Sequence, residues 1–169
     1  FGAGRVIVVE KERYRLDFAE KFASCETLDF SEVDDVVLEI KKMTDWRGAD
    51  VCIEAVGAEA DGSFFQTLTG VKLKLQAGAA TALGWAINST RKGGRVSVVG
   101  VYGPTFNAVP MGNILHKGLT LRASQANVRP HLPKLVELVM EGRVNPKEII
   151  THRFPLEEVA EAYHIFANK

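Results

Sequence analysis

Apolar and polar positions follow two different periods along this chain. Short, mostly apolar runs alternate with stretches in which the apolar residues recur at helical spacing. The runs are typical of strands covered on both faces, and the periodic stretches are typical of amphipathic helices that lie on a sheet. The alternation predicts an α/β protein with a doubly wound, Rossmann-like parallel sheet and crossover helices.

The elements can be placed from this pattern and from turn residues. The predicted strands are residues 5–10, 25–30, 50–57, 95–103 and 119–125. The predicted helices are residues 13–23, 31–47, 78–90, 130–142 and 156–167. Ser31 is expected to cap the second helix, which Arg47 and Gly48 end, and Lys92 to Gly94 should terminate the third. Residues 50–57 and 95–103 are expected to be interior strands and 119–125 to lie nearer an edge, whereas residues 58–76 and the stretch around Pro104 and Pro110 are expected to be a surface excursion and a loop.

The first predicted strand ends on an acid, Glu10. In a doubly wound sheet, an acid at this place accepts hydrogen bonds from the adenosine ribose hydroxyls, and it repels the 2′-phosphate of NADP. Glu10 therefore favours NAD, the alternative being a solvated acid in a strand-to-helix turn. The glycine-rich turn that cradles the pyrophosphate should stand about 20 residues earlier, and only residues 1–4 precede the strand. The chain is expected to be a fragment.

Other candidate residues lie at the ends of the later strands. Gly57 and Gly100 follow apolar runs, where small residues let a cofactor approach the backbone, although each alone could mark an ordinary turn. Arg15 either stacks on adenine or is an exposed helix charge. Glu54 lies inside an apolar strand, so its carboxylate is either paired or reaches the crevice, because a buried unpaired acid is costly.

Composition excludes several classes of function. Lysine plus arginine and aspartate plus glutamate both number 21, so no field favours nucleic acid or an anionic membrane. No apolar stretch reaches the ~18 residues of a membrane span. Cys25 and Cys52 are isolated, which predicts a reduced cytoplasmic protein. No cluster has the spacing of a zinc site, and the scattered histidines are expected to be structural. They are His116, His131, His152 and His164.

Taken together, several motifs resemble those of the medium-chain, zinc-dependent alcohol dehydrogenases. The matching segments are residues 5–10, 48–57, 92–103 and 150–159. The stretch between Gly57 and Lys92, with residues 110–112 and 117–122, is most similar to the branch that resembles glutathione-independent formaldehyde dehydrogenases. The resemblance covers nearly the whole chain.

The resemblance implies a two-domain enzyme with an upstream zinc-binding catalytic domain and a cofactor domain of six parallel strands. Residues 1–169 would be a partial NAD-binding domain without the catalytic domain, the first strand, the glycine-rich turn and the first helix, and cut before the return strand. Losing the first strand removes the central member of the order 3-2-1-4-5-6 and exposes two interior edges. We therefore expect the isolated fragment to be unstable or rearranged. A compact sheet would require the gap to be filled by direct pairing of the flanking strands, by a neighbouring molecule or by further residues.

The resemblance also assigns cofactor contacts to the strand ends. Glu10 would hold the adenosine ribose, and Arg15 would lie by the adenine. The remaining contacts would be Val56 and Gly57 at the adenosine half, Gly100, Val101 and Tyr102 near the nicotinamide, and Ser124 and Gln125 near its carboxamide. The last strand would pair across a dimer axis. The zinc ligands and proton-relay residues of the family have no counterpart here, so no catalytic or metal-binding residue is assigned.

The function predicted for the parent protein is NAD-dependent, zinc-dependent oxidation of an alcohol or a hydrated aldehyde by hydride transfer. The fragment itself is expected to be inactive. Two alternatives are a zinc-free, NADPH-dependent reductase of the same superfamily, against which Glu10 argues, and a non-catalytic nucleotide-binding or interaction module. The sequence does not identify the substrate or the oligomeric state.

Overall fold

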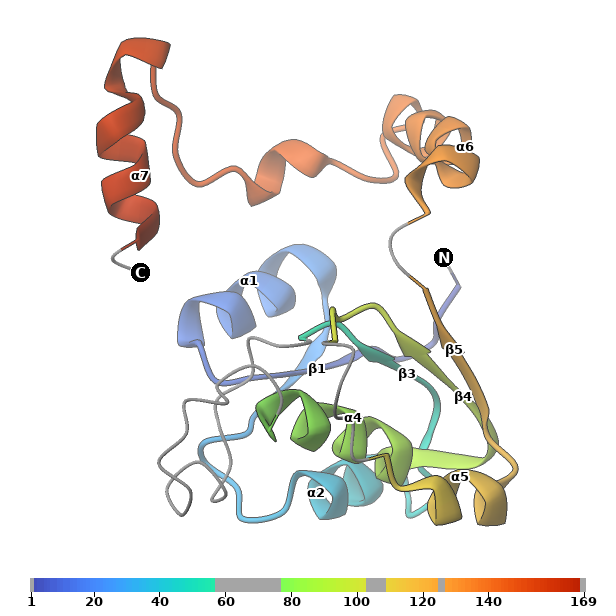
Figure 1. Ribbon diagram of the computed structural model, residues 1–169. Coiled ribbons are helices and arrows are strands. Elements are labelled where there is room, and N and C mark those ends of the chain that lie inside the picture. Colours follow the sequence, from blue (N-terminus) through green and yellow to red (C-terminus); the bar gives the residue numbers. More distant parts are fainter. Residues whose placement is uncertain (1, 57–76, 103–108, 125–126, 168–169) are drawn as a thin grey trace. The chain divides into compact units, whose positions relative to one another are not determined.

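The computed structural model describes residues 2–56, 77–102, 109–124 and 127–167 (Figure 1). They divide into two compact units, Phe1–Gln125 and Ala126–Lys169. All candidate cofactor residues belong to the first.

Two parallel strands joined by a crossover helix begin the first unit (Figure 1). In chain order they are β1 (Ile7–Glu10), α1 (Arg13–Ala23) and β2 (Glu26–Asp29). The strands are in parallel register, so that Glu10 at the end of β1 lies opposite Asp29 at the end of β2. α1 buries Leu16 and Ala19, as its apolar spacing predicted. All three elements lie within two residues of their predicted bounds.

A second parallel sheet has three strands in the order β3-β4-β5. Its elements, in chain order, are β3 (Ala49–Glu54), α4 (Ala77–Ser89), β4 (Thr90–Val98), α5 (Met111–Lys117) and β5 (Thr120–Ala123). The hydrophobic core lies between α4 and β4, where Leu83 and Ile87 pack against Val96 and Val98. β5 pairs only with β4 among the described strands, which confirms its predicted position at an edge.

Among the described residues no strand lies between β1 and β3, and these two do not pair with each other. The prediction of an α/β fold with an incomplete parallel sheet is therefore confirmed. The prediction that residues 50–57 form an interior strand is wrong for the described part of that range, because among the described strands β3 lies at an edge of its sheet. Val51 and Ile53 share one face of β3 and are 52% and 69% exposed. A parallel strand is covered on both faces only where helices lie on both sides, and α4 packs on the other face of β3.

Helix α2 (Val36–Met43) packs on α4 and so connects the two sheets (Figure 1). Its buried residues are Val36 and Ile40. The ring of Phe30, just after β2, lies 5.4 Å from the ring of Trp85 in α4. The first unit is thus held together through its helices, although its strands form two sheets.

The start of α2 corrects a sequence prediction. Asp35, not Ser31, is the N-cap, and its carboxylate accepts a hydrogen bond from the Leu38 amide at 3.0 Å. Ser31 instead donates its amide and hydroxyl to Asp29. Serine and aspartate are both good caps, so local chemistry alone did not separate them. The helix also ends earlier than predicted, with Thr44 as its C-cap.

Two further predictions were wrong around the second sheet. Residues 111–117 were expected to be loop but form α5, which begins directly after Pro110. β4 also begins directly after α4, so Lys92 to Gly94 lie inside the strand, at a register shift against β3, instead of terminating the helix. β4 therefore covers residues 90–98 rather than 95–103.

The second unit contains helical segments without a described strand. They are α6 (Val128–Met140), two 3-10 helices, η2 (Pro146–Ile149) and η3 (Leu156–Glu158), and α7 (Val159–Ala167). α6 begins two residues before Pro130, where its start was predicted, and Leu138 is its buried residue. The last two segments cover the predicted helix 156–167.

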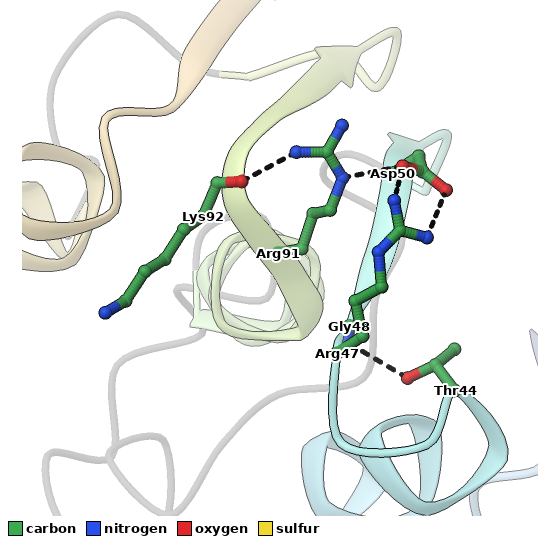
Figure 2. A network of polar contacts seen from close by, with 6 residues as sticks. All are labelled: Thr44, Arg47, Gly48, Asp50, Arg91 and Lys92. Carbon is green, nitrogen blue, oxygen red and sulfur yellow. Dashed lines mark hydrogen bonds and ion pairs between the residues drawn. The ribbon is translucent and has the colours of Figure 1, made fainter.

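A network of polar contacts joins the first residues of β3 and β4 (Figure 2). Asp50 accepts hydrogen bonds from Arg91 Nε at 2.6 Å and from both terminal nitrogens of Arg47. The bond from Arg91, followed by that from Arg47, lowers the pKa of Asp50. Ligands of doubly wound sheets bind at the opposite, carboxyl ends of the strands, so this network supports the strand pairing and not the site.

Candidate functional site

Three parts of the predicted cofactor site lie at the carboxyl ends of β1, β3 and β4. β1 ends at Glu10, β3 at Glu54 and β4 at Val98. Ligands of doubly wound sheets bind beyond these ends. The residues that follow them are therefore the candidates for contact with a dinucleotide.

The Glu10 carboxylate is fixed by three donors. Its Oε1 accepts the amide of Lys11 at 2.8 Å and that of Glu12 at 3.3 Å, and its Oε2 accepts Nη1 of Arg15 at 2.9 Å. A carboxylate offers about four acceptor positions, so this donor set leaves room for a ribose hydroxyl. Arg15 thus lies beside Glu10, a pairing that the sequence had not predicted, and its Nε also donates to the hydroxyl of Tyr14.

Electrostatics keep Glu10 ionised. Burial alone would raise its pKa, but the hydrogen bonds from Arg15 and from the amides of Lys11 and Glu12 outweigh burial, so the pKa of Glu10 is lowered. The side chain is 22% exposed and that of Arg15 is 57% exposed. A charged carboxylate that still reaches solvent is the acceptor that a ribose diol requires.

The loop after β3 carries the next candidates. Val56 is half exposed, and its amide donates to Oε1 of Glu54 at 2.7 Å. Gly57 lies outside the described residues. Glu54 itself is 3% exposed, which resolves the alternatives left open by the sequence in favour of a paired, buried carboxylate.

The loop after β4 turns back onto the same glutamate. The amides of Val99 and Gly100 donate to the main-chain oxygen of Glu54 at 2.7 and 3.2 Å. Val101 is 71% exposed, whereas Tyr102 packs against the core cluster and its hydroxyl is hydrogen-bonded to the Glu54 side chain. The two loops are therefore connected, a relation that no sequence pattern indicated.

The end of β5 is less defined. Ser124, directly after β5, is exposed, and Gln125 lies outside the described residues. The structure brings Glu10 together with Arg15, and Val56 together with Gly100 and Tyr102 around Glu54. The contacts of these residues with a dinucleotide stay predictions.

Sequence reasoning missed the role of Lys117, at the end of α5. Its ammonium donates to three main-chain oxygens, those of Ile87 at 3.0 Å and Asn88 at 2.7 Å in α4 and that of Thr90 at 2.7 Å at the start of β4. Burial, together with the charge of Lys41, lowers the pKa of Lys117. The signal, a lysine that ends a short helix, is too common to have been informative.

An open pocket of about 450 Å³ lies beside Lys117. Its polar lining comes from α2, α4, α5 and their flanking residues, and it contains none of the predicted cofactor residues. The lining residues are Asp35, Val37, Lys41, Asn88, Asn113 and Lys117. All three ammonium hydrogens of Lys117 are already directed at carbonyls, so this lysine is a structural cap.

We next consider metal sites and membrane-spanning helices in the part of the chain that the structure describes. No three histidine, cysteine, aspartate or glutamate side chains gather there to hold an ion. The residues present therefore do not fit a zinc centre. No helix among the described residues combines the length and the apolar character needed to cross a bilayer.

Comparisons with known proteins bear on this arrangement. No family model matches the chain. It is 36% identical over 168 residues to AdhB of Bacillus subtilis, described as an uncharacterized zinc-type alcohol dehydrogenase-like protein; the match covers 99% of this chain and 44% of that protein. It is 30% identical over 172 residues to an alcohol dehydrogenase of Cupriavidus necator, covering 99% of this chain and 40% of that one. The solved structure of alcohol dehydrogenase TADH from Thermus sp. ATN1 matches with a TM-score of 0.75 and 27% identity, over 99% of this chain and 42% of that one.

The chain spans about two fifths of the length of these proteins. The predicted resemblance is confirmed for the family, and the assignment to the formaldehyde dehydrogenase branch stays a prediction. The sequence similarity and the structural similarity each extend over 99% of this chain. The chain is similar in sequence and in fold to zinc-type alcohol dehydrogenases.

Proposed function

We propose that this chain forms the NAD-binding part of a zinc-dependent alcohol or aldehyde dehydrogenase. The observation that carries the proposal is Glu10, an ionised carboxylate at the carboxyl end of a parallel strand, oriented by two amides and Arg15. Such a group accepts hydrogen bonds from the ribose hydroxyls of adenosine. When bound, the nicotinamide would accept hydride from an alcohol or a hydrated aldehyde.

The zinc is proposed only because the similar proteins are zinc-type alcohol dehydrogenases. The described residues hold no cluster that could bind it, so the ligands would lie elsewhere in the polypeptide. No step of the reaction is assigned to residues of this chain. Their proposed work is to bind and orient the dinucleotide.

One observation favours the NADPH-dependent alternative. Arg15 lies beside Glu10, and an arginine near this acid is the group that accommodates the 2′-phosphate in NADP-dependent enzymes. Against it, Arg15 is engaged by the carboxylate, which would face the phosphate at close range. We therefore keep NAD as the proposed cofactor. Measuring the affinity for both NAD and NADP distinguishes the two alternatives.

The test replaces Glu10 with alanine in the complete gene product and in this chain. Hydrogen bonds to a charged group contribute about 1.5–3 kcal/mol, so we expect NAD affinity to fall roughly ten- to 100-fold. NADP affinity should be unchanged or improved, because the repelling charge is gone. Titration calorimetry with both dinucleotides measures the two effects.

Glu157→Ala is the matched control, since it removes an exposed acid from the second unit. It should leave both affinities at the wild-type values. If Glu10→Ala also left NAD affinity and the preference over NADP unchanged, the assignment of Glu10 would be wrong. Binding of NADP in preference to NAD by the wild type would select the reductase alternative.

We further propose that β5 pairs with β5 of a second copy. Its side chains are exposed over the whole strand, and among the described strands it pairs only on the side of β4. An open edge of this kind is usually covered in native proteins. Light scattering on the complete gene product should give at least twice the mass of one chain, and a monodisperse monomer would contradict the pairing.

A further inference from the structure

Glu54 is a buried acid that its strand does not explain. It is the last residue of β3, and its side chain lies on the face that packs against α4. Moving a carboxylate out of water is costly unless donors replace the lost solvent. Its contacts therefore identify what holds it there.

One of these contacts fixes the start of the loop that follows β3. The side chain turns back on its own strand end, where Oε1 accepts the Val56 amide at 2.7 Å. The next residue, Gly57, is one of the predicted contacts of the adenosine half. Glu54 thus determines the direction in which the chain leaves β3.

The other contacts fix the loop that follows β4. The main-chain oxygen of Glu54 accepts the amides of Val99 and Gly100, and the Glu54 carboxylate is hydrogen-bonded to the hydroxyl of Tyr102. Burial, followed by this bond to Glu54, raises the pKa of Tyr102. The phenol therefore stays protonated at neutral pH and acts as the donor.

We infer that Glu54 is a positioning residue that holds the loops after β3 and β4 in one arrangement before a dinucleotide binds. Its side chain touches both loops while facing the core, so it acts through Val56 and Tyr102 and not by contact with the ligand. The consequence for the dinucleotide rests on the proposed function. A loop already ordered in its bound conformation does not lose conformational entropy on binding, which improves affinity.

Hydrogen exchange on the complete gene product tests the clamp itself. Tyr102→Phe removes one hydroxyl and, with it, one donor to the buried Glu54 carboxylate. Such a loss corresponds to roughly a tenfold change in an opening equilibrium. We expect the amides of Val56 and Gly100 to exchange about tenfold faster, while the Arg122 amide in β5 is unchanged. Wild-type exchange at both loops would overturn the inference.

Tyr163→Phe is the matched control, because it removes the hydroxyl of a tyrosine that is 71% exposed. It should alter no exchange rate at either loop. Glu54→Gln keeps the size of the side chain and one acceptor oxygen. The Val56 amide should therefore exchange more slowly in this variant than in Glu54→Ala. Equal rates in these two variants would show that the cavity, and not the lost acceptor, loosens the loop.

Calorimetry with NAD then separates the clamp from the proposed function. If the wild type binds NAD, Glu54→Gln should retain more affinity than Glu54→Ala, which should lose about tenfold. Equal affinity in wild type and both variants would overturn positioning for the dinucleotide. If the wild type binds no dinucleotide, the proposed function fails, and the exchange rates still decide whether Glu54 holds the two loops.

Discussion

Replacing Gly48 with alanine is expected to destabilise the protein by roughly 3 kcal/mol. This loss should exceed that of the same substitution at any other described glycine with positive φ. Gly48 lies between α2 and β3 with φ +86°, a conformation that side chains rarely adopt. A Cβ there would lie 2.6 Å from the main-chain oxygen of Ser89 and 2.9 Å from the amide nitrogen of Arg91. Both are backbone atoms, so no rotamer change relieves the contact.

The surroundings of Gly48 oppose the backbone movement that would relieve this contact. Its amide donates to the hydroxyl of Thr44 (Figure 2), and the atoms it approaches belong to the junction where α4 passes directly into β4. Moving either side separates β3 from β4, and with them Asp50 from Arg91. The strain therefore reaches the pairing on which the second sheet depends.

Denaturant unfolding followed by circular dichroism measures this loss. Gly112→Ala is the matched control, because Gly112 lies in α5 and an added Cβ would meet nothing within 4 Å. Alanine favours helix over glycine by about 1 kcal/mol, so the control should be neutral or slightly stabilised. Similar unfolding free energies for the two variants would contradict the close approach at Gly48.

The sequence predicted those elements in which local pattern and tertiary packing agree. α1 carries Leu16 and Ala19 at helical spacing and buries both. α5 has only seven residues, too few for a helical period to stand out from a loop. The choice between Ser31 and Asp35 as N-cap depended on which residues of α2 are buried, and that is a property of the packing against α4.

The candidate site shows the same division. Glu10 could be proposed as a site residue because the proposal depends only on the end of one strand and on neighbours within five residues. Glu54 could not, because its partner Tyr102 comes from the loop after the next strand of the sheet. The sequence posed the correct question, whether this acid is paired, and only the spatial adjacency of β3 and β4 answers it.

Replacing Lys117 with methionine is expected to cost about 2 kcal/mol of stability. The last carbonyls of a helix lack intrahelical donors, and Lys117 donates to two such oxygens of α4 and to that of Thr90, the first residue of β4. Hydrogen bonds from a charged group contribute about 1.5–3 kcal/mol. Methionine keeps most of the apolar stem, so the change isolates the ammonium.

The position of the pocket decides where in this range the loss should fall. The pocket lined by Asn88 and Lys117 is open, so water can reach part of the end of α4 once the ammonium is gone. Water replaces some of the lost bonds, which keeps the cost near the lower part of the range. Lys117→Arg should recover only part of the loss, because a planar guanidinium cannot direct three hydrogens from one nitrogen.

Unfolding free energies from denaturant titration provide the measurement, with Lys134→Met as the matched control. Lys134 pairs with Glu137 on α6, and both side chains are largely exposed, so its removal should change stability by less than about 0.5 kcal/mol. A loss at Lys117 no larger than this would mean that the α4 carbonyls are satisfied by solvent. The connection between α5 and the start of β4 would then rest on apolar contacts such as that of Ile114 with the core.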